Sequence, residues 1–230
     1  MKQSRIWELD ALRGISILCV IGLHLLFDLQ VFIGLPLLQH PLIQLINAAA
    51  GISFVTLSGL CVTLGKRPAR RGLVVLGWAM AITIVTWVMA KLGVMDENLI
   101  IRFGVLHLLG VCMLLWPLFR SLPTWFFLVG SLVIIPLGTA AASIQTEIPW
   151  LFPLGLRTAR FSSGDYFPLA PYLGWFFLGV FLGRTLYRNK QSLLPDFPCS
   201  FRFFRWCGRH SLLLYLIHQP ILYGIIYLCI

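Results

Sequence analysis

The chain has 230 residues, of which 59% are hydrophobic and 11% are charged, and its mean hydropathy is +0.88. So few polar side chains cannot coat a water-soluble globule, which leaves the lipid bilayer as the solvent. The net charge of +10 does not indicate nucleic-acid binding, because the basic residues lie in short loops between apolar runs, where orientation in a membrane explains them.

Apolar runs long enough to cross a hydrocarbon core of about 30 Å recur along the whole chain. In chain order they cover residues 12–33, 42–64, 72–92, 103–119, 123–142, 169–187 and 210–230. The sequence therefore predicts an all-α, polytopic membrane bundle of about seven transmembrane helices in a single domain, residues 1–230. The first run is full length and carries ionisable side chains, so we interpret it as a retained helix and not as a cleaved signal peptide.

The distribution of basic residues predicts a cytoplasmic amino terminus. With that orientation, 14 of the 18 Lys and Arg residues fall on the cytoplasmic side. They are Lys2, Arg5, Arg13, Lys66, Arg67, Arg70, Arg71, Arg120, Arg184, Arg188, Lys190, Arg202, Arg205 and Arg209. The outer side receives Lys91, Arg102, Arg157 and Arg160.

The two long connections have different compositions. The outer one, residues 143–168, mixes prolines, aromatics and charges, which predicts short helical or re-entrant pieces over the outer face. The cytoplasmic one, residues 184–209, is rich in arginine and is typical of a loop on anionic lipid.

Neither a structural disulfide nor a metal site is expected. Cys19, Cys61 and Cys112 lie inside apolar runs, the basic loop with Cys199 and Cys207 should face the reducing cytosol, and no Cys or His pair within one motif has ligand spacing.

Ionisable side chains inside a span are costly, so they are functional candidates. The first run contains Arg13, His24 and Asp28. At 100° and 1.5 Å per residue, Arg13 and His24 lie about 20° apart around the helix and roughly 16 Å apart along it. Asp28 lies one turn beyond His24, within reach of a hydrogen bond that would orient the imidazole and raise its basicity. This pattern predicts an oriented general base in a membrane cavity.

Structural interpretations compete with each of these functional ones. Arg13 could be an interfacial residue whose charge reaches the lipid head groups, and His24 could be a packing residue. Asp10 could cap the helix or hold Arg13.

Further polar candidates lie in other parts of the chain. They are Arg102, His107, Asp165 and Tyr166 on the outer side, and Tyr215, His218 and Gln219 in the last run. The outer group could converge near His24, while the last-run group is expected at a shallower depth from the cytoplasm. Interhelical hydrogen bonding is the alternative for every one of them.

Ordered motifs over nearly the whole chain resemble those of the bacterial DUF1624 family, which is related to the catalytic region of heparan-alpha-glucosaminide N-acetyltransferase. The motifs are Asp10-Ala-Leu-Arg13-Gly14 followed by His24 and Asp28, Leu57-Ser58-Gly59, Arg102-Phe-Gly-Val-Leu-His107, Asp165-Tyr-Phe-Pro168, Gly174-Trp-Phe-Phe-Leu-Gly179, Gly208-Arg-His-Ser211 and His218-Gln-Pro220. Arg13 and His24 also match the Arg-x10-His pattern of the broader transmembrane acyltransferase superfamily.

The resemblance implies transfer of an acetyl group from cytosolic acetyl-CoA, through the membrane, to an acceptor on the far side. The first-helix histidine, His24, would lie at the reacting centre, with Asp28 beside it. Arg13, next to Asp10, could meet the phosphates of CoA. Whether His24 deprotonates the acceptor or becomes acetylated itself stays open. Candidate donors to the developing oxyanion are His107, Tyr166 and Ser58.

The chain is much shorter than the lysosomal relatives, so a heparan substrate is not implied. An extracytoplasmic glycan or amino sugar at the bacterial inner membrane is the better expectation. The expected partners are membrane lipid, acetyl-CoA and that glycan, and both a monomer and a homo-oligomer are open. The competing functions are a proton-coupled transporter or flippase of an envelope precursor and a non-catalytic membrane partner.

Overall fold

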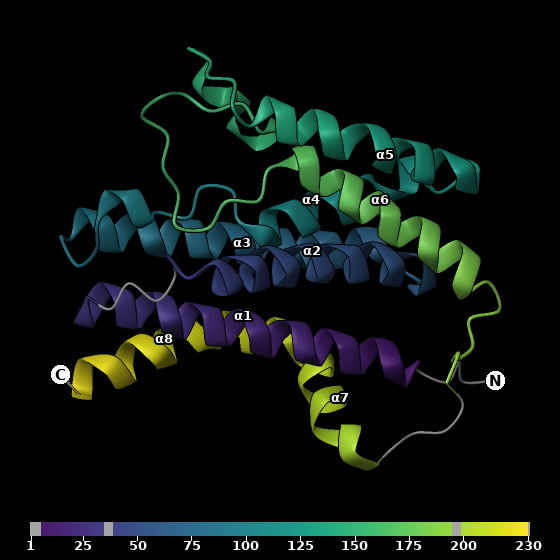
Figure 1. Ribbon diagram of the computed structural model, residues 1–230, viewed down its shortest axis with the longest axis horizontal. Helices are drawn as coiled ribbons and strands as arrows, with labels where there is room; N and C mark the ends of the chain where they lie inside the picture. Colours follow the sequence, from purple (N-terminus) through teal and green to yellow (C-terminus); the bar gives the residue numbers. More distant parts are fainter. Residues whose placement is uncertain (1–5, 35–38, 195–198, 230) are drawn as a thin grey trace. The chain divides into compact units, whose positions relative to one another are not determined.

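The computed structural model of the chain describes residues 6–34, 39–194 and 199–229 (Figure 1). Within these ranges the regular structure consists of α-helices and short 3₁₀-helices, with two isolated β-bridges and no strand. The all-α prediction is therefore confirmed. Lys2 and Arg5, which contribute to the predicted orientation, lie outside the described residues, as does the last residue of the seventh run, Ile230.

Each predicted apolar run contains a helix. The α-helices are α1 (Trp7–Ile33), α2 (Pro41–Leu64), α3 (Pro68–Lys91), α4 (Val105–Phe119), α5 (Thr124–Ala141), α6 (Leu169–Leu186), α7 (Arg202–Arg209) and α8 (Ser211–Cys229). Of these, α1, α2, α3, α5 and α6 are long and apolar enough to cross a membrane, whereas α4 and α8 are shorter apolar helices. An integral membrane bundle follows, while the exact number of spans and the orientation stay predictions.

Two compact units make up the chain, Met1–Leu57 with Tyr187–Ile230, and Ser58–Leu186. We call them the terminal unit and the central unit and describe each by itself. The prediction of a single domain stays a prediction.

Close backbone contact holds α7 against α1 in the terminal unit. A Cβ atom on Gly14 would collide with the carbonyl oxygen of Phe204, and a Cβ atom on Gly208 would collide with the carbonyl oxygen of Asp10. Glycine at both positions therefore permits the crossing. The prediction of residues 184–209 as a plain loop is thus incomplete, because their last turns form a helix packed on α1. Residues 195–198 of that segment lie outside the described residues.

The connection before α7 is tied to the first turn of α1. The buried carboxylate of Glu8 accepts a hydrogen bond from the Ser192 hydroxyl at 2.6 Å and another from the Leu193 backbone N–H at 2.8 Å. The Trp7 indole N–H donates to the Leu194 carbonyl at 2.7 Å.

The central unit pairs α3 with α4 and α5 with α6, which lie side by side in Figure 1. Its core is aromatic: the rings of Phe127 and Phe177 meet edge to face at 5.3 Å, and Trp116 lies 5.9 Å from Phe127. Gly59 of α2 lets that helix approach the backbone of Phe176 in α6. The connection at residues 143–168 contains the predicted short helical piece, a 3₁₀-helix at Pro149–Leu154.

Candidate active site

The terminal unit carries Arg13, His24 and Asp28 on α1. The helix continues from Trp7 to Ile33, so the predicted helical spacing of the three residues holds. Its run of apolar residues contains no proline, and Gly34, with a φ of 75°, ends it in the left-handed conformation. His24 is half-buried and Asp28 is buried.

A backbone carbonyl fixes the tautomer of His24. Its Nδ1 lies 2.9 Å from the carbonyl oxygen of Val20, one turn earlier in α1. Because a carbonyl only accepts hydrogen bonds, Nδ1 must carry the proton. The Nε2 atom of the neutral ring then keeps its lone pair, which is the form needed to take a proton or to attack a carbonyl carbon.

Asp28 has a different partner from the one that the spacing predicts. The carboxylate oxygen Oδ1 accepts a hydrogen bond from the Gln219 side-chain amide at 2.8 Å, and no hydrogen bond joins His24 to Asp28 among the described residues. The prediction that Asp28 orients the imidazole by a hydrogen bond is therefore wrong. Asp28 is still the carboxylate one turn from His24, where it would stabilise an imidazolium through space.

His218 lies beside His24. The two imidazole rings meet edge to face, with centroids 4.8 Å apart, so the expected difference in depth between them is wrong. The Nδ1 of His218 donates to the carbonyl oxygen of Tyr215 at 2.7 Å, which leaves its Nε2 with a lone pair as well. Two imidazoles with the same tautomer thus face one small region of the terminal unit.

Three polar atoms near this histidine pair are buried and have no hydrogen-bond partner among the described residues: Asp28 Oδ2, Gln219 Oε1 and His218 Nε2. Each is an acceptor in the tautomers assigned above. Buried polar atoms without partners are rare because desolvation is costly, so a group of three marks a place where a donor is expected to bind. A hydroxyl or amine of a substrate supplies such donors.

Asp10 does not cap α1, because the helix begins three residues earlier at Trp7. Its carboxylate lies 3.2 Å from the guanidinium of Arg13 and 3.4 Å from that of Arg209 in α7. Arg13 also donates to the carbonyl oxygen of Gly208 at 3.4 Å. The group formed by Asp10, Arg13 and Arg209 therefore braces the α1–α7 contact and keeps one net positive charge.

In the central unit, His107 closes the amino end of α4. Its Nδ1 accepts from the Gly104 backbone N–H at 3.2 Å, so Nε2 carries the proton and donates to the Thr83 hydroxyl at 3.2 Å. Thr83 in turn donates to the carbonyl oxygen of Ile101 at 2.7 Å. Every nitrogen of this buried ring is thus used within the central unit.

The other outer candidates also have partners in the central unit. Asp165 accepts from the Val105 backbone N–H at 3.0 Å, beside the cap of His107. The hydroxyl of Tyr166 donates to the carbonyl oxygen of Phe152 at 2.6 Å, and burial raises the pKa of this phenol while Arg157 opposes the rise. Arg102 is exposed and donates through Nε to the carbonyl oxygen of Ser162 at 3.1 Å.

Ser58 begins the central unit and is buried. Of the predicted residues, the structure groups His24, Asp28, His218 and Gln219 in one cluster, and His107 with Asp165 in another. Sequence reasoning missed Thr83, Glu8 and the carbonyl of Val20. Only Glu8 gave a signal, as an acidic residue just before a long apolar run. No cluster of three metal-ligating side chains occurs in the part of the chain that the structure describes.

A family model described as heparan-alpha-glucosaminide N-acetyltransferase, catalytic, matches residues 5–220 of the chain. Neither a curated protein nor a solved structure matches it significantly.

Proposed function

We propose that the chain moves an acetyl group from cytosolic acetyl-CoA to an extracytoplasmic acceptor. The chain belongs to the heparan-alpha-glucosaminide N-acetyltransferase catalytic family, which implies a transmembrane acetyltransferase. The acceptor is a glycan or an amino sugar of a bacterial envelope, and the enzyme lies in the cytoplasmic membrane. His24 is the residue at the reacting centre.

The hydrogen bond of its ring gives the strongest support for this assignment of His24, and the polar atoms around it add to that support. Its Nδ1 is held by a backbone carbonyl, so its Nε2 lone pair is available in a span where water is scarce. Three unpartnered polar atoms from Asp28, Gln219 and His218 lie near it and suit the donors of a hydroxyl or amine.

Two chemical routes use the same nitrogen. In direct transfer, Nε2 of His24 takes the acceptor's proton while the acceptor attacks the thioester carbonyl. The C–S bond then breaks, and the CoA thiolate takes the proton back from the imidazole. In the covalent route, Nε2 attacks the carbonyl, the thiolate leaves, and the acceptor takes the acetyl group from the imidazole while its proton passes to the thiolate.

The neighbours of His24 would act through charge and orientation. Asp28 stabilises the imidazolium of the direct route, and its bond from Gln219 holds the carboxylate in place. His218 adds a second Nε2 with a lone pair, which can accept a hydrogen bond from the acceptor and so orient it.

At the cytoplasmic end of α1, Arg13 is the proposed contact for the phosphates of CoA. Its guanidinium shares Asp10 with Arg209, so the group retains positive charge that attracts an anion. Asp10, Arg13 and Arg209 would then have two roles, binding of acetyl-CoA and stabilisation of the α1–α7 contact.

For the outer candidates we propose positioning roles. His107 and Asp165 close the amino end of α4, and the hydroxyl proton of Tyr166 is already donated to Phe152, so His107 and Tyr166 are weaker candidates for oxyanion donors than the sequence indicates. Ser58 and Arg102 keep their proposed supporting roles toward the acceptor.

The test measures release of free CoA from acetyl-CoA by the purified protein in nanodiscs, with amino sugars and envelope glycans supplied. We expect turnover that disappears in His24→Ala while acetyl-CoA binding persists. His40→Ala is the matched control, because His40 is an exposed histidine whose ring only accepts from the Leu42 N–H. A folded native protein with neither binding nor turnover would overturn the proposal in favour of a proton-coupled transporter or flippase.

A further inference from the structure

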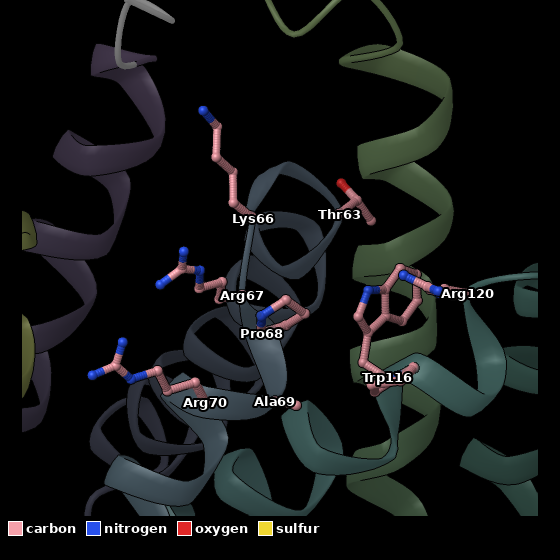
Figure 2. A pocket seen from close by; sticks show the side chains of 10 residues that line it. Thr63, Lys66, Arg67, Pro68, Ala69, Arg70, Trp116 and Arg120 are labelled. Carbon is pink, nitrogen blue, oxygen red and sulfur yellow. The ribbon is translucent and has the colours of Figure 1, made fainter.

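A cavity of about 490 Å³ lies in the central unit, next to the turn that joins α2 to α3 (Figure 2). Its wall carries the basic side chains of Lys66, Arg67, Arg70 and Arg120, together with Trp116. The first three come from the α2–α3 turn and the start of α3, whereas Arg120 follows the end of α4.

Within the central unit, this pocket has an excess of positive charge. All four basic side chains are exposed, and none forms an ion pair with a described residue. The acidic residues of the central unit lie in the connections at the opposite ends of its helices. They are Asp96, Glu97, Glu147 and Asp165. The field around the pocket therefore attracts an anion.

Orientation in a membrane explains basic residues in the α2–α3 turn. It does not explain a cavity between that turn and a second one, the turn from α4 to α5. Arg184 holds the second turn in place by donating to the carbonyl oxygens of Leu122 and Arg120 at 2.6 and 2.7 Å. Its guanidinium also lies over the rings of Trp116 and Phe127, at 5.4 and 4.6 Å. Arg184 therefore fixes the backbone at Arg120 to the aromatic core of the central unit.

The amino end of α3 adds to the same field. Pro68 opens the helix, no side chain caps it, and Pro68, Ala69 and Arg70 line the cavity. The partial positive charge of a helix amino terminus favours phosphate oxygens, as do guanidinium groups.

We propose that this pocket binds the phosphate groups of an anionic ligand. Its volume is within the usual range for small-molecule sites, about 300 to 1,000 Å³. Two sources share the chemistry, the adenosine phosphates of CoA and the head group of an anionic phospholipid. Assignment to CoA rests on the proposed function, whereas phosphate binding itself does not.

The test titrates CoA and dephospho-CoA into the purified protein in an uncharged detergent. The variants are Arg67→Gln combined with Arg70→Gln, and Arg120→Gln. Arg188→Gln is the matched control, an exposed arginine outside the pocket. We expect the Kd for CoA to rise about tenfold for each guanidinium removed, and to change less than twofold in the control. Added salt should weaken native binding and affect the double variant less.

A second arm compares the same proteins in mixed bilayers of phosphatidylglycerol and phosphatidylcholine. Loss of phosphatidylglycerol enrichment in the pocket variants, with CoA binding unchanged, identifies the lipid as the ligand. Unchanged affinity for both ligands overturns the phosphate site. That failure is distinct from failure of the proposed function, because it leaves native CoA release intact. Phosphate binding that depends on the pocket, in a native protein without CoA release, would support the phosphate site and overturn the proposed function.

Discussion

The side-chain amide of Gln219 in α8 donates a hydrogen bond to Oδ1 of Asp28 in α1, over 2.8 Å. The bond joins two helices from opposite ends of the sequence, and it holds the carboxylate that lies one turn from His24. The other oxygen of Asp28 has no partner among the described residues. Charge and orientation at this carboxylate can therefore be separated by mutation.

We expect Asp28→Asn to lower kcat for CoA release by about 10- to 100-fold, because the charge that stabilises an imidazolium is gone. The oxygen that accepts from Gln219 remains, so the free energy of unfolding should change by less than about 1 kcal/mol. Gln219→Leu should instead lower it by about 1 to 3 kcal/mol, since it leaves a buried carboxylate unpaired. Steady-state kinetics and chemical unfolding measure both. Equal kcat in native and Asp28→Asn protein would contradict the electrostatic role.

The helical period was sufficient to predict that Arg13 and His24 share a face, because both lie on one uninterrupted helix. It could not predict the partner of Asp28, since Gln219 comes from another helix. The orientation of His24 was missed for a different reason. The carbonyl one turn earlier competes with the carboxylate one turn later for the same Nδ1.

The depth of His218 depended on a contact that the sequence does not reveal. Gly14 and Gly208 mark where α1 and α7 cross, and His24 and His218 each follow ten residues later. α8 begins at Ser211, three residues after the crossing, so about two helical turns are enough to bring His218 beside His24. Counting from the predicted helix starts at residues 12 and 210 puts His218 nearer the cytoplasm than His24, because the count does not include the crossing at Gly14 and Gly208.

The α1–α7 crossing itself predicts a large effect of one methyl group. Gly14→Ala places a Cβ against the carbonyl oxygen of Phe204, so α7 must move, and we expect a loss of about 1 to 3 kcal/mol in the free energy of unfolding. Gly22→Ala is the matched control, since Gly22 lies in the same helix with open space around it. It should be neutral or stabilising by up to about 1 kcal/mol. Equal melting temperatures for the two variants would contradict the crossing.

His107 and Thr83 should be coupled in stability and not in catalysis. His107→Ala leaves the Gly104 N–H and the Thr83 hydroxyl without this partner. We expect the free energy of unfolding to fall by about 1 to 3 kcal/mol. Thr83→Ala and the double variant complete a mutant cycle, in which we expect a coupling of about 0.5 to 1.5 kcal/mol. A folded His107→Ala protein that keeps native stability but loses kcat would instead assign the ring to the oxyanion.

Tyr166 gives the protein a pH dependence in alkaline solution. Burial raises the pKa of the phenol in the folded state, so the folded protein holds this proton more tightly than the unfolded chain. The contribution to stability is complete below the ordinary pKa of 10.0 and is lost as the pH rises through the folded-state pKa. Tyr166→Phe removes this titration. Its unfolding free energy should fall less steeply above pH 10 than that of the native protein, and identical slopes would contradict the prediction.

The first turn of α1 should control access to the connection before α7. Glu8→Ala removes the acceptor for Ser192 and Leu193. We expect the free energy of unfolding to fall by about 1 to 3 kcal/mol and trypsin to cleave faster after Arg188. Glu147→Ala is the matched control, an exposed acidic residue in the connection between α5 and α6. Limited proteolysis in nanodiscs measures the cleavage rate. Equal rates in both variants would show that Glu8 does not restrain this segment. Faster cleavage with CoA release intact would separate the restraint from the chemistry at His24.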